Sequence, residues 1–235
     1  MLNINLLAMP IKLVVFDMAG TTVKDEDEVT NTFKSALEKY GYSVSPEVIN
    51  PLMGYEKKVA ITKMLHLHEH DLSKITPTLI TNIHQEFISL MIDHYKQTPS
   101  LVALPHAEET MATLRNAGIK IGINTGFSRP IADTIVDRLQ WREKGLFDYL
   151  VASDEVENGR PDPTMIKRMM EQAGITDAQE VAKVGDTEVD VREGQNAGCK
   201  YVIAVTTGAF TRDELTPYHP THIIDDIADV ISIIN

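Results

Sequence analysis

The sequence has very little cysteine, no run of basic residues and no long apolar stretch. Cys199 is its only cysteine, which excludes an internal disulfide and is usual for proteins of the reducing cytoplasm. We predict that Cys199 is a small buried residue before a strand. No segment is apolar over the roughly 20 residues that a membrane helix needs. These absences favour a cytoplasmic protein that is stabilised by an apolar core.

The charge balance excludes another set of partners. The formal net charge is −12 at pH 7, so we expect neither nucleic acid nor an anionic membrane to bind. An anionic substrate would need local positive charge or a metal ion. The first ten residues contain no Lys or Arg, which argues against a signal peptide. Met9 is an alternative start to Met1, and a homodimer is left open.

The first apolar run ends in a carboxylate. Residues 11–16 are mostly apolar and β-branched, a pattern typical of a strand buried on both faces of a parallel sheet. Asp17 follows, at the strand end where open α/β sheets bind ligands. Gly20 permits a sharp turn, and Thr21 and Thr22 bring hydroxyl and N–H groups beside the carboxylate. A strand followed by a solvated turn is the alternative.

The rest of the chain indicates two parts. Residues 24–103 carry apolar residues at helical spacing without a strand pattern, which predicts a small helical cap domain inserted after the first strand. From residue 104 onward strands and helices alternate, which predicts a doubly wound, Rossmann-like parallel α/β core made of residues 11–23 and 104–235. We expect its later strands at 119–124, 149–152, 181–184, 201–205 and 222–224. We expect helices at about 107–117, 130–139, 163–173 and 188–197, and a last one from Asp225-Asp226.

Polar residues follow three of these later strands. Thr125 and Gly126 offer a hydroxyl and free N–H groups before a helix, which suit phosphate oxygens. Arg160 lies in a loop with two prolines and offers fixed charge and a planar fork of donors. Asp186 and Asp190 are four residues apart at a helix start, so they can meet a cation. Each segment alone has an ordinary explanation as a cap or salt bridge, but all of them reach one sheet edge.

This set resembles the four motifs of the haloacid dehalogenase superfamily over residues 11 to about 210. Asp17-Met18-Ala19-Gly20-Thr21-Thr22 resembles its phosphonatase branch, because Ala19 stands where most phosphatases have a second Asp. The resemblance implies that Asp17 is a nucleophile that accepts the phosphoryl group. It implies Mg²⁺ held by Asp17, the Ala19 carbonyl and Asp186, with Asp190 as a supporting or water-mediated ligand, and oxygen ligands favour Mg²⁺ over zinc. It also implies a phosphate site formed by Gly20, Thr21, Thr125, Gly126 and Arg160.

A second segment resembles the same branch. Residues 53–58 read Met-Gly-Tyr-Glu-Lys-Lys, similar to the Met-Gly-x-x-Lys segment whose lysine forms a Schiff base with the substrate aldehyde in phosphonatases. The resemblance gives Lys57 that role and places Met53, Gly54 and Phe127 at the substrate. A surface lysine on a lid helix is the alternative. Ala60 and Phe127 replace a histidine and an aromatic hydroxyl of the family pattern, which favours a carbonyl phosphonate other than phosphonoacetaldehyde.

The resemblance therefore implies a Mg²⁺-dependent hydrolase that forms an aspartyl phosphate and cleaves the C–P bond of a small carbonyl phosphonate. The alternative is a phosphomonoesterase for a small metabolite such as phosphoglycolate or a sugar phosphate. Ala19 disfavours it, because alanine cannot protonate an alkoxide leaving group. A non-enzymatic binding protein on the same fold is disfavoured because Asp17, Asp186 and Arg160 are all present.

Three closely spaced histidines resemble a metal cluster. His66, His68 and His70 are two residues apart, so they would diverge on a helix. We predict a solvated loop or helix end here, with Leu65, Leu67 and Leu72 in the core.

Overall fold

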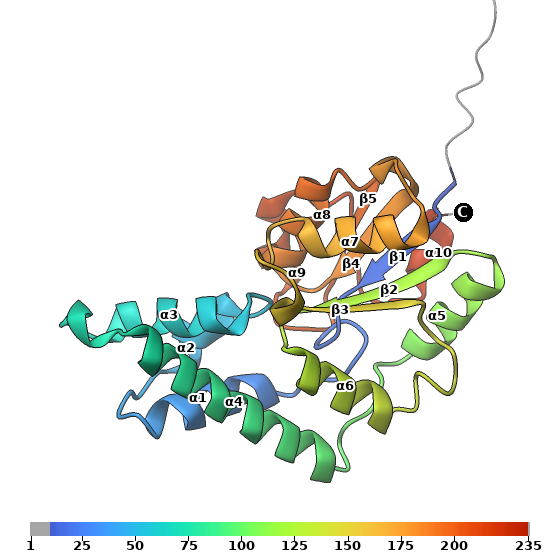
Figure 1. The fold of residues 1–235 in the computed structure, drawn as a ribbon. Helices are drawn as coiled ribbons and strands as arrows, with labels where there is room; N and C mark the ends of the chain where they lie inside the picture. The colour runs from blue at the N-terminus through green and yellow to red at the C-terminus, as the bar shows by residue number, and fades with distance from the viewer. Residues whose placement is uncertain (1–9, 235) are drawn as a thin grey trace, which may run out of the picture.

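The computed structural model of the protein describes residues 10–234, and the choice between Met1 and Met9 lies outside them. Its centre is a six-stranded parallel sheet with the strand order β3-β2-β1-β4-β5-β6 (Figure 1). The strands are β1 (Leu13–Phe16), β2 (Lys120–Thr125), β3 (Tyr149–Ala152), β4 (Val181–Gly185), β5 (Tyr201–Val205) and β6 (His222–Ile224). The predicted doubly wound parallel α/β sheet is confirmed, and the five later strands begin and end within one residue of their predicted bounds.

Helices cover both faces of the sheet (Figure 1). Leu13 and Val15 of β1 pack with α7 (Thr164–Ala173), α8 (Glu188–Ala197) and α9 (Arg212–Leu215) on one face. Val14 and Phe16 belong to the cluster on the other face, with α5 (Ala107–Asn116), α6 (Arg129–Arg138) and α10 (Asp229–Ile234). Because β1 lies between β2 and β4 and is fully buried, it fixes the residue that follows it at the middle of the sheet edge.

Between β1 and α5 the chain forms a group of helices, α1 (Glu28–Glu38), α2 (Pro46–Ile49), α3 (Lys57–His68) and α4 (Pro77–Gln97), which lie together beside one end of the sheet (Figure 1). We call them the inserted helices. The rings of Phe33 and Phe87 join α1 to α4, with 4.4 Å between their centroids. Short 3₁₀ helices occupy Asn50–Leu52, Leu72–Lys74, Ser153–Glu155, Ala178–Glu180 and Thr216–Tyr218. Within residues 10–234, no helix combines the length and the apolarity needed to span a membrane.

The last helix begins later than predicted. It starts at Asp229 and not at Asp225-Asp226. The Asp226 carboxylate accepts the Ala228 N–H at 2.9 Å and lies 2.7 Å from Nδ1 of His106. These contacts hold residues 225–228 in a turn ahead of the helix, so Asp226 caps a turn instead of starting the helix. Asp225 accepts hydrogen bonds from Thr206 and Arg212.

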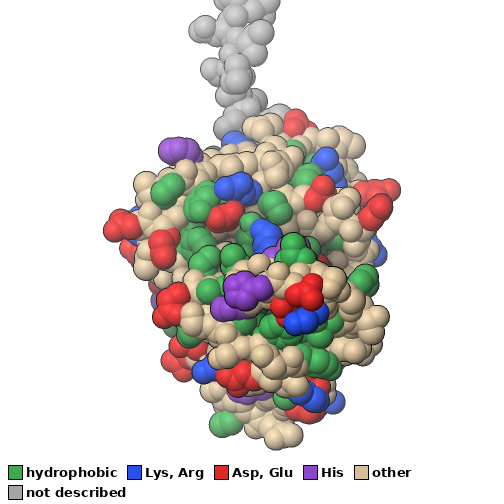
Figure 2. Space-filling model, turned by 90° about the vertical axis from the view of Figure 1, so that its left-hand side faces the viewer, with side chains coloured by type: hydrophobic (Ala, Val, Ile, Leu, Met, Phe, Trp, Pro, Cys, Tyr) green, Lys and Arg blue, Asp and Glu red, His purple; other side chains and the backbone are tan. Residues whose placement is uncertain are grey.

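The three histidines lie at the solvated end of α3, as predicted. Figure 2 views the molecule from the side of the inserted helices and shows histidine side chains on that surface. Leu67 and Leu72 were wrongly predicted to be buried, since they are 68% and 61% exposed. Leu67 lies in the last turn of α3, which projects beyond the neighbouring helices (Figure 1), and Leu72 begins the short 3₁₀ helix that follows. Cys199 is buried, as predicted.

Candidate active site

The end of β1 holds Asp17 in a tight loop. Asp17 is buried, and its N–H donates to the carbonyl of Val184 at 2.9 Å, which extends the pairing with β4 by one residue. Gly20 has φ +82°, and a Cβ there would lie 2.6 Å from Oδ2 of Asp186. Only glycine combines this backbone conformation with this approach. The Thr21 hydroxyl donates to Oδ1 of Asp186 at 3.0 Å, which ties the loop to the segment after β4.

Three buried carboxylates meet at this point. Asp17, Asp186 and Asp190 each offer an oxygen, and these oxygens lie within 4.8 Å of one another. Burial raises the pKa of Asp17 above its ordinary value. Burial and the neighbouring Asp17 and Asp190 raise the pKa of Asp186 well above its ordinary value. A divalent cation would relieve this repulsion, and a set of oxygen donors suits a hard cation. The cluster can therefore hold a metal ion.

Asp190 differs from the other two carboxylates. Its Oδ1 contacts Arg160 and lies 2.9 Å from Nζ of Lys183, and its Oδ2 accepts the Thr187 hydroxyl at 2.6 Å. Burial alone would raise the pKa of Asp190, but Lys183 and Arg160 lower it to about 2. Because both of its oxygens already have side-chain partners, the geometry favours a supporting role over direct metal contact.

Arg160 brings positive charge to Asp17. Its side chain is buried, and Nη1 lies 2.7 Å from Oδ1 of Asp17. The Nε atom of Arg160 is also buried and has no hydrogen-bond partner among residues 10–234. Burial would favour the neutral guanidinium, but Asp17 and Asp190 raise the pKa of Arg160, so it keeps its charge. A phosphoryl group placed at Asp17 would meet this charge directly.

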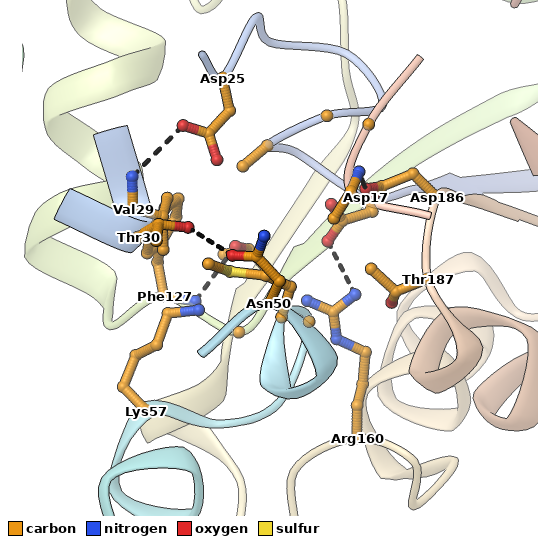
Figure 3. Close-up of a pocket in the computed structure, with 18 of the residues that line it drawn as sticks. Asp17, Asp25, Val29, Thr30, Asn50, Lys57, Phe127, Arg160, Asp186 and Thr187 are labelled. Carbon is orange, nitrogen blue, oxygen red and sulfur yellow. Dashed lines mark hydrogen bonds and ion pairs between the residues drawn. The ribbon is translucent and has the colours of Figure 1, made fainter. Parts of the chain in front are cut away.

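A cavity of about 180 Å³ lies in front of Asp17 (Figure 3). On the core side it is lined by Asp17, Ala19, Gly20, Thr125, Gly126, Phe127, Arg160 and Asp186. On the side of the inserted helices it is lined by Asp25, Thr30, Asn50, Met53, Gly54 and Lys57. A cavity of this volume suits a small molecule.

Lys57 enters the cavity from the first turn of α3. The side chain of Glu56 caps this helix by accepting the N–H groups of Lys58 and Val59 at 3.1 and 3.0 Å. Lys57 is only 4% exposed, and its Nζ lies 4.9 Å from the ring centroid of Phe127 and 5.5 Å from that of Phe33. Burial, followed by the charge of Arg160, lowers the pKa of Lys57 to about 8. A lysine with this pKa can act as an amine near neutral pH.

The inserted helices approach the core closely at Gly126. A Cβ on Gly126 would lie 2.7 Å from the carbonyl oxygen of Gly54 and 2.6 Å from that of Tyr55. The turn after β2 and the loop before α3 are therefore in contact, and this contact brings Lys57 and Asp17 into one cavity.

The model of the haloacid dehalogenase-like hydrolase family matches residues 14–204, which include all four segments that carry the site. The chain belongs to this family. It is therefore a hydrolase, and the site at the edge of the sheet is built from the segments that the sequence resemblance indicated.

Relatives of this chain are named as phosphonoacetaldehyde hydrolases. The bifunctional phosphonoacetaldehyde hydrolase/aminoethylphosphonate transaminase of Clostridioides difficile is 33% identical over 210 residues, which are 85% of this chain but only 32% of that protein. The phosphonoacetaldehyde hydrolase of Bacillus cereus is 31% identical over 213 residues, 86% of this chain and 78% of that protein. A phosphonoacetaldehyde hydrolase-like protein from Oleispira antarctica superposes with a TM-score of 0.80 at 23% identity, over 100% of this chain and 95% of that one. The last likeness shows the fold alone.

Most residues predicted for the site of this haloacid dehalogenase-like hydrolase line the cavity. Thr21 and Asp190 do not line it. Thr21 binds Asp186, and Asp190 binds Arg160, each on the side away from the cavity. The sequence did not indicate Asp25, Thr30 or Asn50, which also line it. These residues lie within a charged loop or among apolar residues at helical spacing. Nothing in their local sequence marks them as functional.

The sequence also gave no prediction of a buried ionic network behind the site. Nζ of Lys183 lies 2.9 Å from Asp190 and 3.4 Å from Glu193, and it donates to Oδ1 of Asn124 at 2.7 Å. Nδ2 of Asn124 donates to Glu193 at 2.7 and 2.9 Å. Lys183, Asn124 and Glu193 are 0% exposed. A lysine inside the apolar run 181–184 was the signal that could have revealed this network.

Proposed function

We propose that this hydrolase cleaves the C–P bond of a small carbonyl phosphonate with Mg²⁺ and an aspartyl-phosphate intermediate. The observation that carries the proposal is that Lys57, with a pKa lowered to about 8, shares one small cavity with Asp17. One pH unit below that value, about a tenth of Lys57 is an unprotonated amine. Phosphoryl transfer to Asp17 makes no use of such an amine unless the substrate carries a carbonyl group.

The residues present fit a magnesium ion. Asp17, Asp186 and the Ala19 carbonyl would hold it, with Asp190 supporting Arg160. When bound, it neutralises the two carboxylates and the charge of the phosphoryl oxygens. The donors are oxygens only, and burial raises the pKa values of Asp17 and Asp186. Both observations support a hard divalent cation here.

The chain's own residues would carry the reaction. Lys57 attacks the carbonyl carbon, and loss of water leaves an iminium that draws electrons out of the C–P bond. Asp17 attacks phosphorus, the C–P bond breaks, and its electron pair forms the enamine on Lys57. Arg160 stabilises the charge on the phosphoryl oxygens, as does the turn at Thr125 and Gly126. The enamine then takes a proton from water on the carbon that carried phosphorus, which gives an iminium. Water hydrolyses this iminium and the aspartyl phosphate.

Ala19 supports this route over ester hydrolysis. An alkoxide leaving group gains about 10²–10⁴-fold from a positioned acid, and alanine supplies no proton. An enamine leaves without that help. We also propose that residues 24–103 form a cap over a core of residues 11–23 and 104–235, because the inserted helices supply Lys57, Met53 and Gly54 to the cavity.

The proposal is tested by trapping Lys57. Wild-type protein is incubated with Mg²⁺, borohydride and either phosphonoacetaldehyde or acetonylphosphonate, and the modified residue is located by peptide mass spectrometry. We expect an adduct on Lys57 with at least one of the two. Lys57→Arg should lose phosphate release as fully as Lys57→Ala, because arginine keeps the charge but forms no imine at neutral pH.

Lys58→Arg is the matched control, since Lys58 is the exposed neighbour on the same helix turn. It should keep wild-type activity. Phosphate release retained in Lys57→Arg, with no adduct in the wild type and turnover of phosphate esters, would replace this proposal with a phosphomonoesterase.

A further inference from the structure

Asp25 lies on the cavity wall that carries Lys57. It belongs to the loop between β1 and α1 and is half-buried. Oδ1 of Asp25 accepts the Val29 N–H at 3.3 Å, which fixes the carboxyl group at the start of α1. Figure 3 shows the other carboxyl oxygen turned toward the cavity. The loop thus presents a carboxyl group to the substrate side of Lys57.

The proposed reaction needs a proton donor at this place. When a carbinolamine on Lys57 becomes an iminium, its hydroxyl group must leave as water. The positions that could have carried such a donor hold Ala19, Ala60 and Phe127, which have no titratable side chain. Asp17 and Asp186 lie on the opposite, core side of the cavity (Figure 3). Among the described residues, Asp25 and Asp27 are the carboxyl groups that line the cavity on the Lys57 side, and Asp25 accepts the Val29 N–H. The Glu56 carboxylate caps α3 and does not line the cavity.

We propose that Asp25 is the acid–base residue of imine formation and imine hydrolysis, an inference that rests on the function proposed above. In the forward step the C–O bond of the carbinolamine breaks and the nitrogen lone pair forms the C=N bond. Asp25 gives its proton to the departing oxygen, so water leaves. In the hydrolysis of the product iminium, Asp25 takes one proton from the attacking water. No other reactant is required, and Asp25 returns to its starting state.

The surroundings of Asp25 allow both the protonated and the ionised carboxyl group near neutral pH. Burial, followed by a hydrogen bond with Glu28, raises the pKa of Asp25 to about 7. The groups that interact with it electrostatically from the packed elements are Glu28 on α1, Lys57 on α3 and Tyr95 on α4. The rest of its own loop carries Asp27 and the ion pair of Lys24 with Glu26, 2.7 Å apart. The acidic neighbour Glu28 favours the protonated form, which the forward step needs.

The test compares the rate of borohydride-trapped adduct formation on Lys57 across pH 6 to 9 in the wild type and in Asp25→Asn, with phosphonoacetaldehyde or acetonylphosphonate as probe. Asparagine keeps an oxygen for the Val29 N–H, so α1 retains its start. In the wild type the rate should be highest between about 7 and 8, because Lys57 must be unprotonated and Asp25 protonated. Asp25→Asn should be slower by about 10²-fold and should lose the decrease at high pH.

Two further variants keep the test decisive. Glu26→Gln removes an exposed charge from the same loop and should keep the wild-type rate and pH profile. Asp25→Glu retains a carboxyl group and should keep the decrease at high pH even if its rate falls. An unchanged rate in Asp25→Asn, or a slower rate with an unchanged pH profile, overturns the role of Asp25 alone. Absence of any adduct in the wild type overturns the proposed function itself.

Discussion

The carboxylates of Asp17 and Asp186 repel each other inside the site. The pKa values of Asp17 and Asp186 are raised in the folded chain, so these groups contribute stability at low pH that is lost as the pH rises through their folded values. At neutral pH the folded protein without a cation therefore carries an electrostatic cost, and a cation bound between the carboxylates removes it.

We therefore predict that Asp186→Asn stabilises the metal-free protein while it abolishes the response to magnesium. For the wild type, Mg²⁺ at about 100 times its dissociation constant should add about 2.7 kcal/mol of stability, which is several degrees in Tm for a chain of this size. Differential scanning calorimetry at pH 8, with Mg²⁺ or chelator, measures both effects.

The exposed Asp213→Asn on α9 is the control for this experiment and should keep the wild-type response. A Tm of the wild type that does not change between chelator and Mg²⁺ would contradict the metal role of Asp17 and Asp186.

The sequence predicted those residues of the site that lie in a motif at the end of a strand. Asp17, Thr125 and Asp186 each follow a strand that reads as an apolar run, and parallel strands end at one edge. Asp25 was not predictable, because its burial depends on how α1 and α4 pack around a charged loop. A loop carboxylate of this kind looks solvated in any local pattern.

At the scale of elements, β4 and α8 join the site to the core through Lys183. This lysine neutralises Asp190 and Glu193, and burial of all three charges is tolerated because each has partners. Removal of the lysine would leave two buried carboxylates short of positive charge, and Arg160 would lose the fixed position of its partner Asp190.

We predict that Lys183→Met lowers the free energy of unfolding by about 3–5 kcal/mol. Urea unfolding followed by circular dichroism measures this loss. The double variant Lys183→Met/Glu193→Gln should regain part of it, because the remaining carboxylate, Asp190, still has Arg160 as its counter-ion. Equal stability of the single variant and the wild type would show that the network does not stabilise the fold.

The elements themselves were predicted well where burial is uniform. Strands covered on both faces read as short apolar runs, so the last five were located within a residue. The start of α10 and the burial of Leu67 and Leu72 were predicted wrongly. The start of α10 depends on a turn held by Asp226, and the exposure of the two leucines depends on where the neighbouring helices end. The local spacing of apolar residues indicates neither.

For the molecule as a whole, the contact at Gly126 sets the position of the inserted helices against the sheet. Nothing in the sequence marks this contact, since it joins residues more than 70 positions apart. The two backbone carbonyls at Gly54 and Tyr55 leave no room for a side chain there.

We predict that Gly126→Ala lowers kcat/KM by about 10–100-fold, because the methyl group displaces Lys57 from Asp17 and misplacements of about 1 Å cost this much. The backbone at Gly126 does not have a positive φ, so the Tm should fall by no more than a few degrees. Steady-state kinetics and calorimetry on the same preparation separate the two effects. A variant with wild-type kcat/KM would show that the helices can reposition freely.

The link between Arg160 and Asp17 has a consequence for which molecules the enzyme reacts with. In the proposed reaction Asp17 is the attacking group, and before the substrate binds its Oδ1 already lies 2.7 Å from Nη1 of Arg160. An incoming phosphoryl dianion offers the guanidinium a second partner and so competes with the carboxylate for it. Binding of the phosphoryl dianion to Arg160 therefore frees the Asp17 carboxylate to attack that same phosphoryl group. A neutral electrophile of the same size does not compete for Arg160. It therefore meets an Asp17 carboxylate that is still paired with Arg160.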